Sequence, residues 1–268
     1  MYTQPTQPTE QSIRLITRAD DAGSARTADR AILDAIEGGI VRNVSLMAVG
    51  PTIEHAAELL AGRRDVCFGI HGTLNAEWTD VRWGPILGAA KVPSLVEPDT
   101  GMFTPTPAHF LNRAPAVEEV MAELQAQLDR LRSLGFHISY ADSHMVFEWA
   151  IPQIAEPFDR WCEREGIRNY KRYSKLLPET ASGSDKVSNP VDALITRLKH
   201  AEPGQYLIVG HPGYDEADMR AFGNADYKSE QVVADRINER LLFMREDVLA
   251  IVKERGIVPI RYDEANEL

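Results

Sequence analysis

The chain has 268 residues, of which 44% are hydrophobic, and a formal net charge of −11 at pH 7. This length supports one well-buried core, so we expect a flexible N-terminal tail at residues 1–12 and a single domain at residues 13–268. The acidic balance supplies no basic patch for nucleic acid and no basic stripe for a membrane surface. We therefore expect a small neutral or cationic molecule as the partner, and a homodimer is compatible with the composition.

Two cysteines, Cys67 and Cys162, both lie in apolar patterns, and we expect them to be core thiols rather than a disulfide framework. The first residues show neither a basic nor an apolar leader region, and no stretch approaches the roughly 18 apolar residues of a membrane span. The sequence therefore predicts a cytoplasmic protein.

Apolar runs and helical periodicity alternate along the chain. The predicted strands are residues 13–19, 41–49, 65–71, 136–142, 167–171, 206–211 and 257–262. The predicted helices are residues 28–36, 53–60, 117–131, 154–161, 191–198 and 229–255. Seven strands that alternate with helices indicate an α/β fold with parallel strands and right-handed crossovers, closed as a barrel or left open as a doubly wound sheet. Residues 72–114 are irregular and long for a connection, which favours a functional loop that forms a substrate wall.

Polar residues follow several of the predicted strands. Asp20 and Asp21 end the first strand, His71 ends the third, Asp142 and His144 end the fourth, and His211 ends the sixth. In both parallel architectures these positions lie on the ligand-binding edge of the sheet. Taken singly, each has a structural explanation, such as a helix cap, a turn or a hydrogen-bonded histidine. Their coincidence favours a functional site.

Carboxylate and imidazole together suit a divalent metal such as Zn²⁺, which keeps an open position when three protein groups bind it. Asp21, His71 and His144 form such a set. The adjacent Asp20 can then stay ionised beside the cation and accept a proton from water. This explains why two acids stand side by side at the end of one strand.

The motifs also resemble a known family. The segments ADDAG, GIVRNVSLMAVGP, FGIHGTLN, DSH and GHPG occur in order and are similar to those of the YdjC-like (ChbG/HpnK type) carbohydrate deacetylases. The resemblance implies a distorted (β/α) barrel of the polysaccharide-deacetylase kind that hydrolyses the N-acetyl group of an amino sugar with one divalent metal. It implies Asp21, His71 and His144 as metal ligands, Asp20 as catalytic base and His211 as general acid. The ligand types favour Zn²⁺, whereas the family is often assigned Mg²⁺.

The chain departs from the family pattern after the DSH block. Family members often continue with further histidines, whereas here His144 is followed by Met145, Val146, Phe147 and Glu148. Family substrates such as acetylated chitooligosaccharides therefore transfer poorly to this chain.

Four further residues are candidates for contact with the sugar. Trp78 and Trp83 could stack on a sugar ring, with packing on the barrel rim as the alternative, and Arg82 and Glu148 could contact hydroxyls.

Two other functions remain open from the sequence. Another metal-dependent barrel hydrolase, of the amidohydrolase or phosphoesterase kind, would also gather His and Asp at strand ends, but the usual H-x-H pair on the first strand is absent. A sugar-binding relative without turnover is the second alternative.

Overall fold

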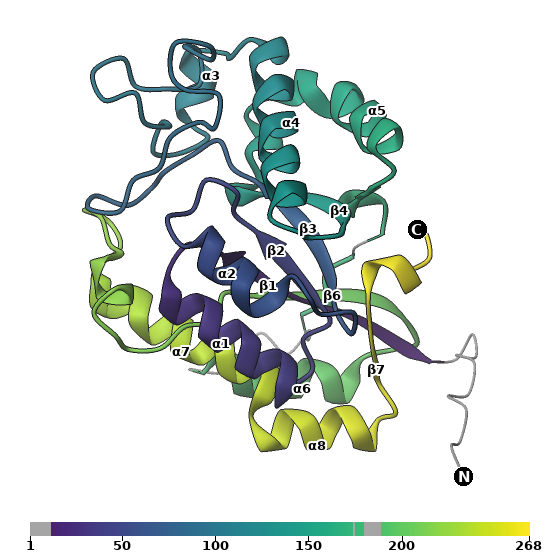
Figure 1. The fold of residues 1–268 in the computed structure, drawn as a ribbon. Coiled ribbons are helices and arrows are strands. Elements are labelled where there is room, and N and C mark those ends of the chain that lie inside the picture. Colours follow the sequence, from purple (N-terminus) through teal and green to yellow (C-terminus); the bar gives the residue numbers. More distant parts are fainter. Residues whose placement is uncertain (1–11, 174, 180–188) are drawn as a thin grey trace.

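The computed structural model describes residues 12–173, 175–179 and 189–268, and a curled parallel sheet lies at its centre (Figure 1). Its strands are β1 (Ile13–Ala22), β2 (Asn43–Leu46), β3 (Cys67–Gly72), β4 (Ile138–Ser143), β5 (Arg168–Asn169), β6 (Gly204–Gly210) and β7 (Val258–Ile260). Every strand pairing is parallel, so the predicted set of about seven parallel strands is confirmed. The tail predicted at residues 1–12 lies, except for Ser12, outside the described residues.

The sheet is an incomplete barrel rather than a doubly wound sheet. The strand order is β5-β4-β3-β2-β1-β6, and β7 pairs with β1 beside this path. The long β1 pairs with β6 on one edge, and on the other edge with β7 near its start and β2 near its end. Beyond β5, Leu176 forms a single bridge to Leu207 of β6. The gap between the two outer strands is therefore spanned only locally, which confirms the predicted distorted barrel.

Helices surround the outside of this sheet, as Figure 1 shows. They are α1 (Arg26–Glu37), α2 (Ile53–Leu60), α3 (His109–Asn112), α4 (Val117–Ser133), α5 (Ala155–Glu165), α6 (Pro190–His200), α7 (Ser229–Met244) and α8 (Glu246–Glu254). The prediction of one helix over 229–255 is wrong, because Arg245 is extended (φ −65°, ψ 136°) and separates α7 from α8. Its guanidinium binds Asp247 in the first turn of α8 at 2.7 Å and also contacts Asp192 of α6. This arrangement lets both helices pack against α6.

Three predicted strands are much shorter than expected. The strand predicted at 41–49 is paired only over β2, and the one predicted at 257–262 only over β7. The strand predicted at 167–171 ends at Asn169, after which a 3₁₀ turn begins. Within the irregular region 72–114 the structure contains the four-residue helix α3 and two isolated strand bridges. Both cysteines are buried and unpaired, as predicted. Among the described residues, the structure contains no helix of the length and apolarity needed to cross a bilayer.

Alternating side chains of the strands build two cores. Leu15 points to the large outer core under the helices, whereas its neighbour Ile16 belongs to a small inner cluster. The inner cluster consists of Ile16, Cys67, Tyr140, Leu207, Ile260 and Tyr262. Gly69 allows this packing, because a Cβ atom there would lie 2.3 Å from the ring of Tyr140. The Tyr140 hydroxyl lies 2.9 Å from Ser45 Oγ, which starts a polar layer toward the carboxyl ends of the strands.

Candidate active site

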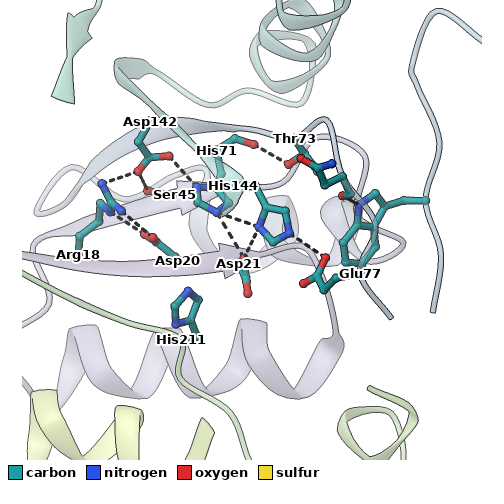
Figure 2. A network of polar contacts seen from close by, with 12 residues as sticks. Arg18, Asp20, Asp21, Ser45, His71, Thr73, Glu77, Asp142, His144 and His211 are labelled. Carbon is teal, nitrogen blue, oxygen red and sulfur yellow. Dashed lines mark hydrogen bonds and ion pairs between the residues drawn. The ribbon is translucent and has the colours of Figure 1, made fainter. Parts of the chain in front are cut away.

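Three predicted ligands lie together where β1, β3 and β4 end (Figure 2). Asp21 Oδ1 is 3.5 Å from His71 Nε2 and 3.5 Å from His144 Nδ1, and these two nitrogens are 3.3 Å apart. All three side chains are buried, and among the described residues Asp21 Oδ1 has no hydrogen-bond partner. A buried carboxylate oxygen without a donor is costly. Its convergence with two imidazole nitrogens fits a divalent cation of the kind that binds nitrogen and oxygen.

Both histidines are oriented by a carboxylate on the far side of the ring. His71 Nδ1 lies 2.6 Å from Asp142 Oδ1, and His144 Nε2 lies 3.0 Å from Glu77 Oε2. Each carboxylate accepts a hydrogen bond from its ring nitrogen, and the other nitrogen of each ring faces Asp21. This carboxylate–histidine arrangement is typical of metal centres. The ring of Trp83 packs edge-on against His144, with 6.0 Å between ring centroids.

Asp20 is held by an arginine of the same strand. Arg18 and Asp20 are two residues apart on β1 and share a face. Arg18 Nε and Nη2 each lie 2.7 Å from an oxygen of Asp20, and Nη1 lies 2.8 Å from Asp142 Oδ2. Asp20, His71 and Asp142 form a second group of ligand atoms within 4.8 Å of one another. Here, however, the buried guanidinium already supplies the compensating positive charge.

Neighbouring charges shift the titration of these groups. Burial lowers the pKa of His144, but Glu77 and Asp21 raise it to about 10. Burial raises the pKa of Asp21, yet the charges of His211 and His144 hold it well below its usual range. Likewise, Arg18 and His71 overcome burial and lower the pKa of Asp142. The centre therefore favours a positive charge between its carboxylates, which a divalent cation can supply.

His211 follows β6 and reaches the same centre from the other side. In Figure 2 its ring lies below Asp20 and Asp21. His211 Nδ1 is 2.8 Å from Glu239 Oε2, which also accepts a hydrogen bond from the His211 backbone N–H at 2.7 Å. Arg236 lies between Glu239 and Asp21, at 3.4 Å and 3.2 Å. Burial and Arg236 lower the pKa of His211, but Asp21 and Glu239 raise it further, so that it lies above its ordinary value.

The turn that carries Asp21 has an unusual backbone. Asp21 is left-handed (φ 67°), and the next glycine, Gly23, has φ 95°. The carboxylate of Asp29 accepts hydrogen bonds from the Gly23 N–H at 2.7 Å and from Thr52 Oγ1 at 3.0 Å, and it lies 2.8 Å from His55 Nδ1. Left-handed non-glycine residues persist only where surrounding contacts hold them, and they cluster at functional sites.

The metal-type cluster opens into a cavity of about 680 Å³. Its polar lining comprises Arg18, Asp20, Asp21, His71, Glu77, Thr106, Ser143, His144, His211, Asn224 and Arg236. Its apolar and aromatic lining comprises Trp78, Met145, Val146, Tyr170, Leu176, Leu207, Val209 and Tyr227. The volume lies within the range of about 300–1,000 Å³ that is usual for small-molecule sites.

The four predicted sugar contacts lie in different surroundings. Trp78 lines the cavity next to Tyr227. Trp83 is buried and donates its indole N–H to the Asn75 carbonyl at 2.6 Å. Arg82 binds Glu97 at 2.8 Å and the Phe103 carbonyl, and Glu148 is buried against Ser143 and Lys171. Of the four, only Trp78 belongs to the described cavity lining.

Several residues at the site were not predicted from the sequence: Arg18, Glu77, Arg236 and Glu239. Arg18 could have been found, because its spacing of two from Asp20 places both side chains on one face of a strand. Glu77 stands in an irregular segment without periodicity. Arg236 and Glu239 resemble the solvated face of a long helix, and nothing in their own segment indicates Asp21 or His211 as partners.

A curled parallel sheet with a buried histidine and aspartate cluster at its carboxyl edge is the architecture of an α/β protein built around a metal-type centre. A family model described as "YdjC-like protein" matches residues 14–254, and the chain belongs to this family. The carbohydrate deacetylase of Geobacillus stearothermophilus is 36% identical over 268 residues, covering 94% of this chain and 98% of that protein. That of Thermoanaerobacter pseudethanolicus is 26% identical over 92% of this chain and 97% of that protein.

A solved structure shows the same fold. It is the crystal structure of an Enterococcus faecalis V583 protein named for cellobiose-phosphate cleavage, with a TM-score of 0.73 and 21% identity. The match covers 94% of this chain and 98% of that chain.

Proposed function

We propose that the protein is a metal-dependent carbohydrate deacetylase that hydrolyses the N-acetyl group of an amino sugar. The observation that carries this proposal is the convergence of Asp21 Oδ1, His71 Nε2 and His144 Nδ1 at the end of a cavity of ligand size. Family membership and the names of the relatives supply the reaction class. They favour a deacetylase over the other barrel hydrolases considered above.

Asp21, His71 and His144 would hold the cation. When bound, a divalent metal supplies Lewis-acid polarisation of the amide carbonyl and lowers the pKa of water. Two nitrogen ligands and one oxygen ligand favour Zn²⁺ or another transition metal over Mg²⁺, which prefers oxygen. Metal analysis of the purified protein decides this point.

In this proposal Asp20 acts as the base. One of its oxygens belongs to the group of ligand atoms within 4.8 Å that includes His71, so it lies beside the reacting centre. Arg18 binds both of its oxygens and fixes their orientation. As water attacks the acetyl carbon, Asp20 accepts the water proton, and a new carbon–oxygen bond forms.

In this proposal His211 acts as the acid. Its Nδ1 proton is engaged by Glu239, so Nε2 is the nitrogen left to face a substrate in the cavity. The raised pKa favours the protonated ring. When the carbon–nitrogen bond breaks, His211 donates a proton to the departing amine, and acetate and the free amino sugar are the products.

The proposal is tested by measuring acetate release from N-acetylglucosamine and its oligomers, with the bound metal quantified in parallel. We expect activity that a chelator abolishes and added metal restores. Asp20→Asn should lower kcat by about 10²–10⁴-fold while metal content stays stoichiometric. Asp129→Asn, an exposed carboxylate on α4, is the matched control and should match the wild type.

Wild-type turnover in Asp20→Asn would refute the assignment of the base. Stoichiometric metal and sugar binding without acetate release over long incubation would instead establish the non-catalytic alternative. The cytoplasmic location, the homodimer and the single domain at residues 13–268 stay predictions.

A further inference from the structure

Aliphatic side chains gather at the mouth of the catalytic cavity. Met145, Val146 and Leu176 all line the cavity, and they are 36%, 50% and 67% exposed. Isolated exposed apolar residues are ordinary on protein surfaces. However, three of the eight large apolar side chains exposed in the described part of the chain line this one cavity. Such a concentration is typical of a surface that binds something apolar.

The backbone beneath two of these residues is held in a costly conformation. Met145 (φ 55°, ψ 17°) and Val146 (φ 50°, ψ 45°) are both left-handed, which is rare for a β-branched residue. The adjacent Phe147 is fully buried, and the Glu148 carboxylate accepts a hydrogen bond from Ser143 Oγ. These contacts hold the turn, so the aliphatic side chains are presented at the mouth in advance of binding.

The charges of the cavity do not suit a phosphorylated sugar. Arg18 is paired with Asp20 and Asp142, and Arg236 is paired with Asp21 and Glu239. No lysine occurs among the described lining residues, and the carboxylates of Asp20, Asp21 and Glu77 line the same cavity. A phosphate would therefore find no arginine or lysine free of a carboxylate partner there, and it would be repelled by like charge.

We propose that Met145, Val146 and Leu176 form a subsite for an apolar group that the substrate carries beside its amide. The substrate is then an uncharged N-acylated amino sugar with an alkyl-like substituent. This inference rests on the proposed function and specifies its substrate class. The occupant belongs to the substrate because the subsite is continuous with the catalytic cavity: His144 directly precedes Met145, and the cavity volume suits a small molecule.

The apolar group can be either an aglycone or a longer N-acyl chain, since both lie next to the amide of a 2-amino sugar. Two substrate series distinguish these sources. The first is the methyl, butyl and hexyl glycosides of N-acetylglucosamine, and the second is N-acetyl-, N-propionyl- and N-butanoyl-glucosamine. N-acetylglucosamine 6-phosphate is the charged comparison. The measured quantity is kcat/KM for release of the carboxylic acid.

We expect kcat/KM to rise along one series, by roughly tenfold or more from methyl to hexyl if the aglycone fills the subsite. A fully buried methylene group is worth about fourfold in binding. Flat values in both series, or a preference for the phosphorylated sugar, would overturn the inference.

The double variant Met145→Asn/Val146→Asn tests the subsite directly. Asparagine tolerates left-handed backbone better than most residues, so the turn and His144 should keep their places. We expect the ratio of kcat/KM between the longest and the shortest member of the preferred series to fall toward one. Leu111→Asn, at an exposed residue on α3 outside the cavity lining, should keep the preference of the wild type. The single variant Leu176→Asn, far from His144 in sequence, repeats the test if the double variant does not fold.

Calorimetric binding of the same compounds separates the two proposals. If no compound releases acid, the proposed function is wrong, and the inference is then decided by affinity alone. A dissociation constant that falls along one series supports the apolar subsite without turnover. Equal dissociation constants along both series would overturn it.

Discussion

Two turns carry two of the three predicted ligands of the metal-type centre, Asp21 and His144, and they are built differently. The first turn, at the end of β1, holds Asp20 and Asp21, and the second turn, directly after β4, holds His144 followed by Met145 and Val146. Both contain left-handed residues. The first turn is buried and fixed by polar contacts, whereas the second exposes aliphatic side chains at the cavity mouth.

This difference between the two turns indicates that they have different roles. In the first turn two polar contacts hold Asp21 in place: Asp29 accepts a hydrogen bond from the Gly23 N–H, and Arg236 binds the second carboxylate oxygen of Asp21. The second turn carries one predicted ligand, and its next two residues line the cavity. We infer that variation after His144 changes which substrate is accepted, whereas variation in the first turn changes the chemistry itself.

Removing a ligand from either turn should have the largest effect. We expect Asp21→Ala and His144→Ala each to lose most of the bound metal and to reduce acetate release to background, because a site of three protein ligands is left with two. Metal content and kcat are the measurements. If His144→Ala kept stoichiometric metal, the second turn would have no part in the centre and the comparison would fail.

We expect the second-largest effect from changes to the polar contacts that hold the first turn. Asp29→Asn neutralises a carboxylate that accepts hydrogen bonds from the Gly23 N–H and Thr52 Oγ1. The same carboxylate lies beside His55 Nδ1. We expect metal affinity to fall by about tenfold and the free energy of unfolding to fall by about 1–3 kcal/mol. Metal titration and denaturant unfolding measure the two effects.

The corresponding change in the second turn is Glu148→Gln, which weakens the contacts to Ser143 and Lys171. It should alter the chain-length preference more than the metal affinity. Equal loss of metal affinity in Asp29→Asn and Glu148→Gln would show that the two turns do not differ in their roles in metal binding and substrate choice.

The charge network of the first turn also reaches His211, the proposed acid. Asp21 is linked through Arg236 to Glu239, which binds His211. Because Glu239 raises the pKa of His211, Glu239→Gln should lower it. The proton-donating form is lost as pH rises through this pKa, so the alkaline limb of kcat/KM should move to lower pH.

The matched control for this shift is Glu148→Gln in the second turn, which has no contact with His211 and should leave the alkaline limb in place. Glu230→Gln, at an exposed position in the first turn of α7, controls for a carboxylate change on the same helix. An unshifted limb in Glu239→Gln would remove His211 from the role of acid.

The sequence predicts those parts of the site that follow from strand order. Asp21, His71 and His144 each stand where an apolar run ends, and parallel strands bring such ends to one edge. Glu77 could not be predicted this way, because it lies in a segment without periodicity. Arg236 and Glu239 meet Asp21 and His211 only after the whole barrel is formed.

The same limit applies to the fold. The alternation of strands and helices predicts the parallel sheet, but helical periodicity continues across Arg245, so the break between α7 and α8 is not visible in the sequence. The partial closure of the barrel depends on a single bridge between Leu176 and Leu207. A single bridge between short segments leaves no recognisable pattern in the amino-acid sequence.

The smallest expected effect concerns backbone strain in the second turn. Val146→Gly removes a β-branched side chain from a left-handed position, and glycine adopts such backbone at no steric cost. We expect the free energy of unfolding to stay level or rise by up to about 1 kcal/mol, since relief of strain offsets the greater freedom of glycine in the unfolded chain. Val258→Gly, at a comparably exposed position in β7, should instead lower it by roughly 0.5–1 kcal/mol. Denaturant unfolding compares the two. Equal destabilisation would mean that the second turn is unstrained, and that its aliphatic residues are held at the cavity mouth without a conformational cost.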